Sequence, residues 1–166
     1  PAGRTCRVAH VPIAADTHVL GGKPYLNLGT STTLELRGGV DQAFVFVRAD
    51  TAALRAAVGT GTVEGAELTF AVAQGSNEST SMKAFALTTD FVERSGLHGA
   101  TWDCADDADV TNFVDDCSGA TAWSLAGAGT RPWSAWPSAG AFYAGAGQPL
   151  VVFDVRSDVT AFLGAT

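Results

Sequence analysis

The chain has few charged residues, and few of those are basic. Asp, Glu, Lys and Arg make up 16% of its 166 residues, where about 25% is usual for a globular domain. Its 10 Lys and Arg residues form no cluster, and the net charge is −7. Because clustered basic side chains are needed to displace the counterions of a polyanion, we expect no nucleic-acid partner. Since no apolar run approaches the roughly 20 residues that span a bilayer, we also expect no membrane insertion.

The chain also lacks the short motifs of common catalytic and metal sites. It has no Gly-x-Ser-x-Gly, no His-Glu-x-x-His and no phosphate-binding loop. Its three histidines, His10, His18 and His98, stand alone and offer no zinc-ligand spacing. A glycosidase needs a positioned pair of carboxylates, and none of the many carboxylates lies beside a clear aromatic cleft. We therefore expect a non-catalytic protein.

Abundant turn residues and alternating segments predict an all-β fold. Gly contributes 19 residues and the hydrophobic fraction is 46%, which suits short strands joined by tight turns around a real core. The strands are expected at 16–20, 32–37, 42–48, 62–73, 82–88 and 150–155. The segment 120–149 is expected to form long loops or short edge strands. The pattern predicts an antiparallel β-sandwich of jelly-roll type.

Short helical turns and an arm complete the predicted domain. One helical turn is expected at 52–58, and a short C-terminal helix is expected at 157–163 with Ser157 as its N-cap. The size of the chain indicates a single domain, placed at 14–166, with an N-terminal arm at 1–13.

Six of the 17 acidic residues crowd into the segment 103–116. No Lys or Arg occurs between Ser95 and Thr130, so these carboxylates repel one another unless a cation or solvent relieves them. Oxygen-only ligands suit a hard cation, and Ca²⁺ is the usual one. The ligands of the predicted Ca²⁺ site are Asp103, Asp107, Asp109, Asn112 and Asp116. The alternative is a solvated acidic loop without a metal.

Cys104 and Cys117 can close this acidic segment. They stand 13 positions apart in a polar, turn-rich stretch, and a disulfide there would contribute about 3 kcal/mol to stability. A zinc-binding pair would lack further thiols and a His at ligand spacing. Cys6 is left over, as a free thiol, an intermolecular bridge or the partner of a residue outside this sequence.

Aromatic residues are spaced along the segment 120–149, which is otherwise rich in Gly, Ala, Ser and Pro. Sugar rings stack on flat aromatic side chains while polar groups bind their hydroxyls. The predicted ligand-binding residues are Trp123, Arg131, Trp133, Trp136 and Tyr143. The alternative is that these rings cover the end of the core, because Trp is usually mostly buried. Trp102 continues a strand pattern and is assigned to the core.

Several segments occur in an order that is similar to the motifs of one family. They are Ala15-Asp16-Thr17-His18-Val19, Asn27-Leu28-Gly29, Val63-Glu64-Gly65-Ala66-Glu67-Leu68, Ala100-Thr101-Trp102 and Phe153-Asp154-Val155. In this order they resemble the DNRLRE-type domains, β-sandwich modules of secreted bacterial and archaeal proteins. The resemblance implies a secreted or cell-surface location and, as in some members, carbohydrate binding, with alginate the best-known ligand class. By fold analogy, Asp16, Asn27 and Asp154 form a second, weaker metal hypothesis.

These features together predict a non-catalytic extracellular module that binds polysaccharide and is stabilised by Ca²⁺. Arg48, Lys83 or Arg131 would meet a carboxylate on an anionic glycan, whereas the net charge of −7 keeps a neutral glycan open. The rival prediction is a structural surface module, such as an adhesin segment or a subunit of an extracellular filament. Its contacts with other subunits or surface proteins would involve the N-terminal arm and Cys6.

Overall fold

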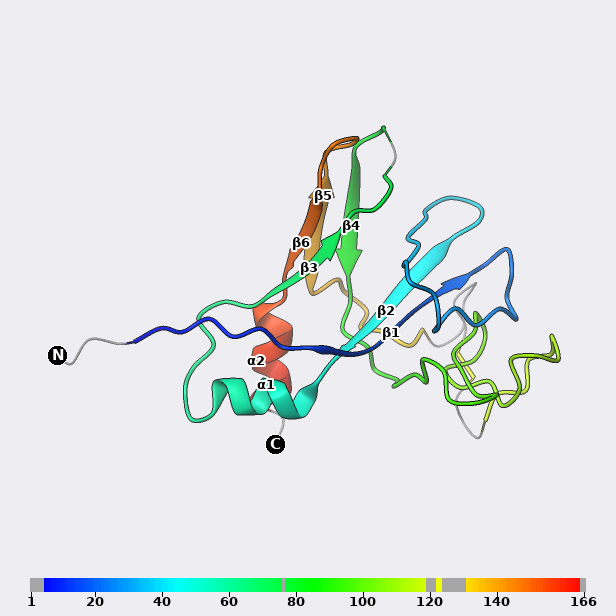
Figure 1. Ribbon diagram of the computed structural model, residues 1–166, viewed down its shortest axis with the longest axis horizontal. Coiled ribbons are helices and arrows are strands. Elements are labelled where there is room, and N and C mark those ends of the chain that lie inside the picture. The colour runs from blue at the N-terminus through cyan, green and yellow to red at the C-terminus, as the bar shows by residue number, and fades with distance from the viewer. Residues whose placement is uncertain (1–4, 76, 119–121, 124–130, 165–166) are drawn as a thin grey trace.

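A computed structural model describes residues 5–75, 77–118, 122–123 and 131–164 (Figure 1). Along these residues the elements are β1 (Ile13–Leu20), β2 (Ala43–Ala49), α1 (Thr51–Val58), β3 (Glu67–Ala71), β4 (Thr80–Ala84), β5 (Ala139–Tyr143), β6 (Leu150–Asp154) and α2 (Arg156–Gly164). The described strands form three antiparallel two-stranded sheets, β1–β2, β3–β6 and β4–β5. The fold is therefore mainly β, as the sequence predicts, with two short helices.

The β1–β2 ribbon carries the first of two apolar cores. Val19 on β1 and Phe46 on β2 are buried there. The rings that cover them come from loops: the Phe46 ring centroid lies 5.0 Å from that of Trp123 and 5.8 Å from that of Phe91. Trp102 also belongs to this core, which confirms its assignment from the sequence. The loops around residues 91–105 are thus fixed by packing against the ribbon.

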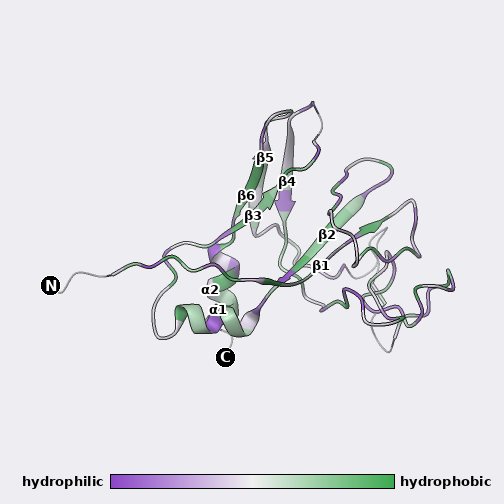
Figure 2. Ribbon diagram, in the orientation of Figure 1, coloured by the Kyte–Doolittle hydropathy of each residue, from purple (hydrophilic) through white to green (hydrophobic). Residues whose placement is uncertain are grey.

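The other four strands share the second apolar core. Alternate residues of β3 and β6 face it, among them Phe70 and Phe153, whose rings meet edge to face at 6.1 Å. Tyr143 at the end of β5 and Met82 on β4 pack into the same cluster. Figure 1 shows the β3–β6 and β4–β5 ribbons side by side, and Figure 2 shows hydrophobic colouring along β3 and β6. The period-2 pattern of these strands is what gives each ribbon one apolar face.

The predicted elements with strong local signals are present, with changed limits. The predictions at 42–48, 52–58 and 150–155 correspond to β2, α1 and β6. The segment 62–73 shortens to β3, 82–88 shifts to β4, and the expected edge strand within 120–149 is β5.

The strand predicted at 32–37 is wrong. Only Arg37 bridges to Ala43, and Leu36 is 51% exposed. Near the start of the segment, the Ser31 hydroxyl donates to the Thr33 carbonyl at 2.7 Å and accepts from its N–H at 3.3 Å. This local turn replaces the hydrogen bonds that a neighbouring strand would make.

The two helices lie at the ends of strands. Asp50 caps α1, because its carboxylate accepts from the Ala53 N–H at 2.9 Å. The helix α2 begins at Arg156, so the N-cap predicted at Ser157 is wrong; Asp154 accepts from the Arg156 N–H at 3.0 Å instead. The Arg55 guanidinium of α1 lies 4.7 Å from the Phe162 ring centroid of α2.

The described part of the N-terminal arm runs along α1. The Arg7 guanidinium donates to the Ala57 carbonyl at 2.7 Å, and the Asp50 N–H donates to the Pro12 carbonyl at 2.8 Å. Cys6 is exposed and forms no disulfide. Among the described helices, none has the length and apolar character needed to cross a membrane.

Candidate metal centre and ligand groove

Backbone pairing fixes the position of Asp107 in the acidic segment. Asp107 and Gly99 exchange two backbone hydrogen bonds of 2.8 and 3.1 Å. On the other side, the Ala108 N–H donates to the Asp116 carbonyl at 3.0 Å, and Asp107 bridges to Cys117. Asp107 is therefore held between two neighbouring segments of chain, one around Gly99 and the other at Asp116 and Cys117.

The predicted disulfide between Cys104 and Cys117 is present. Their Cα atoms are 5.1 Å apart, and Cys104 is fully buried. The bond ties the start of the acidic segment to its end, so residues 115 and 116 return to the neighbourhood of residues 104–107. The backbone of Trp123 adds a further tie, because its N–H donates to the Asp103 carbonyl at 2.9 Å.

Asp107 is a fully buried carboxylate, with 0% of its surface exposed. One oxygen, Oδ1, accepts from the Asp109 N–H at 3.0 Å, whereas no hydrogen-bond donor contacts Oδ2. Burial, followed by the hydrogen bond with the Asp116 carboxylate and the nearby charges, raises the pKa of Asp107 from its ordinary 3.8 to about 6. The same hydrogen bond is the main cause that lowers the pKa of Asp116. Of the two carboxyl groups, Asp107 is therefore the one that takes up a proton first as the pH falls.

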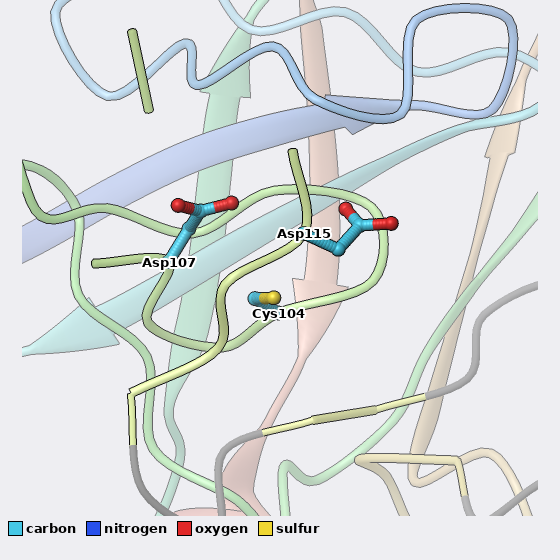
Figure 3. A group of neighbouring side chains, drawn as sticks. All are labelled: Cys104, Asp107 and Asp115. Carbon is cyan, nitrogen blue, oxygen red and sulfur yellow. The ribbon is translucent and has the colours of Figure 1, made fainter. Parts of the chain in front are cut away.

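Asp115 is the third carboxylate of this cluster. Its carboxylate, that of Asp107 and the sulfur of Cys104 all lie within 4.8 Å of one another, and Figure 3 shows the two carboxylates on either side of Cys104. Asp115 is exposed, so it opens the cluster to solvent. Its charge is also the second cause, after burial, that raises the pKa of Asp103. The sulfur is not a free thiolate, since Cys104 is bonded to Cys117.

The predicted metal ligands divide into two groups in the structure. Asp107 and Asp116 lie together, and Asp103 interacts with the same neighbour, Asp115. Asp109 and Asn112 form turns beside them: Asp109 Oδ1 accepts from both the N–H and the hydroxyl of Thr111, at 3.0 and 2.5 Å, and Asn112 Oδ1 accepts from the Val114 N–H at 2.8 Å. Both residues also contact Asp116, because the Asp109 N–H donates to its Oδ1 at 3.3 Å and the Asn112 amide nitrogen donates to its Oδ2 at 3.1 Å.

The candidate centre therefore differs from the predicted ligand set. It consists of Asp107, Asp115 and Asp116, with Asp103 nearby. Sequence reasoning missed Asp115, although its place two positions before Cys117 was a usable signal. A disulfide from Cys117 to Cys104 necessarily brings this residue back towards Asp107.

Asn27, part of the second metal hypothesis, holds backbone groups instead. Its amide nitrogen donates to the carbonyls of Glu93 and Ala100, both at 2.8 Å, and its oxygen accepts from the Gly29 N–H at 3.3 Å. The side chain is buried. It therefore connects the loop after β1 to the loop that leads into the acidic segment.

The predicted ligand-binding aromatics do not form one surface. Trp123 is 6% exposed and its indole N–H donates to the Thr101 carbonyl at 3.1 Å, while Tyr143 is 4% exposed in the second core. The Trp123 ring belongs to the first core and offers no face to a sugar, so the binding role predicted for it is wrong. Tyr143 is also nearly buried but lines the groove described below, and its binding role stays a prediction. Trp136 is 82% exposed, whereas Trp133 is half-buried with the Arg131 guanidinium 5.8 Å from its ring centroid.

An open groove of about 2960 Å³ separates β2 from β3 and β4. Trp133 lies in it together with Phe44 of β2 and Phe85, which follows β4. The Trp133 ring centroid is 5.2 Å from that of Phe44 and 6.0 Å from that of Phe85. We call these three residues the aromatic platform. Neither Trp136 nor Arg131 lines the groove.

Basic residues in the groove are partly neutralised by acidic neighbours. Arg48 forms an ion pair with Asp90 at 2.5 Å, and Arg37 is paired with Glu35. Lys83 of β4 also lines the groove. The groove therefore carries charges of both signs beside the aromatic platform.

Searches against protein-family models, curated proteins and solved structures found no significant match to this chain. The resemblance to the DNRLRE-type domains thus stays a prediction from the sequence motifs.

Proposed function

We propose that this protein is a non-catalytic, extracellular module that binds polysaccharide in the groove between β2 and β3–β4. The observation that carries the proposal is the aromatic platform of Phe44, Phe85 and Trp133 inside this groove. Flat rings that are partly exposed offer the surface on which the C–H faces of sugars stack. The disulfide is compatible with a secreted or cell-surface location.

The size and charge of the groove favour a long, neutral ligand. Small-molecule pockets occupy roughly 300–1,000 Å³, so a groove of about 2960 Å³ suits several units of a polymer. Two of its arginines, Arg37 and Arg48, already have carboxylate partners. An anionic glycan such as alginate would have to compete with Glu35 and Asp90 for them. A jelly-roll arrangement of the strands remains part of this proposal.

The test is binding of soluble neutral and anionic polysaccharides by calorimetry and affinity electrophoresis. Trp133→Ala should weaken binding about tenfold, which corresponds to about 1.4 kcal/mol for a stacked ring. Trp136→Ala is the matched control, because it removes the same side chain outside the groove. Equal losses in both variants, or no binding to any polysaccharide in the panel, would reject the groove as the glycan site.

The second candidate function is a structural surface module. Each described strand pairs on one side only, so β3 and β4 present open edges, and open edges can pair with a strand of another chain. The arm adds the exposed Cys6, which can form a bridge between chains. Concentration-dependent assembly in sizing chromatography that Cys6→Ser weakens would favour this function. A monomer at all concentrations would exclude it.

A further inference from the structure

The acidic cluster gathers negative charges in a segment that contains no Lys or Arg. Asp115 lies within 4.8 Å of Asp107, and the Asp116 carboxylate is close enough to share a hydrogen bond with it. No Lys or Arg occurs between Ser95 and Thr130. The nearby His98 ring lies 3.0 Å from Asp106, which is a different carboxylate. Three neighbouring negative charges at neutral pH thus have no basic partner in their own segment of the sequence, and a cation would relieve their repulsion.

Asp107 adds an observation that is independent of the crowding. It is fully buried, and its Oδ2 has no hydrogen-bond donor. A buried polar atom without a partner costs about 1–3 kcal/mol, and more when it is charged. The backbone ladder to Gly99 prevents Asp107 from moving out to water. An oxygen held in place, charged and without a donor is what a cation site requires.

The chemistry of the atoms that could ligate a metal favours a hard cation. Around the cluster the available donors are carboxylate oxygens, because the disulfide occupies the Cys104 sulfur. Hard, oxygen-binding cations such as Ca²⁺ take six to eight oxygens in flexible geometry, including water. The exposed Asp115 leaves room for water and gives the ion an entry path.

We propose that Asp107, Asp115 and Asp116 bind one Ca²⁺ ion, which closes the acidic segment as a structural site. Asp107 supplies the buried oxygen. Asp115 and Asp116 belong to the segment that the Cys104–Cys117 disulfide holds next to Asp107. The ion replaces the missing donor at Asp107 Oδ2. This site lies outside the groove, so its test and the glycan test can fail separately.

Thermal melting of chelator-treated protein with Ca²⁺ added back tests the proposal. Extracellular Ca²⁺ modules have Kd values of about 10⁻⁴–10⁻³ M, so 10 mM Ca²⁺ reaches about 10–100 times Kd. A ligand that binds only the folded state should then raise Tm by about 3–10 °C. Tb³⁺ luminescence, sensitised by Trp102 next to Asp103 and competed by Ca²⁺, measures binding without relying on stability.

Three variants decide whether these carboxylates are the ligands. Asp107→Asn and the exposed Asp115→Asn should each remove most of the Ca²⁺-dependent rise in Tm and weaken Tb³⁺ binding at least tenfold. Asp106→Asn is the matched control, since it removes one charge from the same loop but not from the cluster. It should keep the full Ca²⁺ response whatever it does to Tm without metal.

Any of three results would overturn the proposal. The first is an unchanged Tm in 10 mM Ca²⁺ with no Tb³⁺ signal, and the second is an equal loss of the Ca²⁺-dependent rise in Tm in Asp106→Asn and Asp115→Asn. The third is a larger rise in Tm with Mg²⁺ than with Ca²⁺. Because Asp115 is exposed, its variant should fold even if Asp107→Asn does not. The Tb³⁺ titration of that variant alone therefore decides the assignment.

Discussion

Removal of the Cys104–Cys117 disulfide should destabilise the protein by about 3 kcal/mol. The bond closes a loop of roughly 14 residues, and the chain-entropy relation gives about 3 kcal/mol for such a loop at 25 °C. Since 1 kcal/mol shifts Tm by about 2–4 °C in a domain of this size, the loss in Tm should be about 6–12 °C. The variant Cys104→Ala/Cys117→Ser avoids placing a hydroxyl at the buried Cys104 position.

Urea unfolding monitored by fluorescence measures the loss in free energy of unfolding. Cys6→Ser is the control, because that thiol is exposed and unbonded, and its effect should stay within about 0.5 kcal/mol. Counting free thiols in denatured protein adds a direct check: one before reduction and three after. A loss below about 1 kcal/mol in the double variant would refute the view that the disulfide restrains the acidic segment.

Four further substitutions probe the cores and the buried polar groups by urea unfolding. Asn27→Ala should cost about 2–4 kcal/mol, because the buried Ala100 carbonyl and the partly buried Glu93 carbonyl lose their donor; a loss below about 1 kcal/mol would contradict this. Trp123→Ala should cost about 3–5 kcal/mol, whereas Trp136→Ala should change stability by less than about 0.5 kcal/mol; similar losses would show that the cores are misplaced. Burial lowers the pKa of His18 below 6.5 although Glu35 opposes it, so the unfolded chain takes up a proton that the folded chain does not. Stability should therefore fall as pH drops through 6.5, and His18→Gln should reduce that fall; an unchanged pH profile would contradict this.

Local sequence patterns predicted the elements that local forces determine. The β-branched and aromatic run of β2 carries its own signal, and both β2 and the helix expected at 52–58 formed where expected. The segment 32–37 carries an equally clear alternation but no strand lies along it. Alternation shows that a segment is able to pair, whereas pairing also requires a neighbour, and that neighbour is determined by the whole chain.

The candidate site could likewise be predicted only where local sequence determines it. The composition of 103–117 was enough to predict the disulfide and two of the clustered carboxylates, Asp107 and Asp116. Whether an aromatic residue faces sugar or core depends on distant contacts. Trp123 stands in a Gly- and Ala-rich stretch that looks like a surface loop, yet Phe46 of β2 holds its ring in the first core. No pattern within that stretch reveals this contact.

A line of stacked rings connects the acidic segment to the groove. Trp102 directly precedes Asp103, and its ring stacks on Phe44 at 5.4 Å and 23°. The Phe44 ring centroid in turn lies 5.2 Å from that of Trp133, and both residues belong to the aromatic platform. Packed rings move together, because a shift of one opens a gap against the next. An ion that orders Asp103–Asp116 should therefore also order the platform.

The consequence can be measured once a glycan is found. Chelation should weaken glycan binding several-fold in the wild type, because a platform that is less ordered must lose more entropy on binding. The effect should be absent in Asp115→Asn, which already lacks the ion, and present in Asp106→Asn. Full glycan affinity in chelator would show that Trp102 and Phe44 stay in place without the ion, and that the acidic segment stabilises only itself.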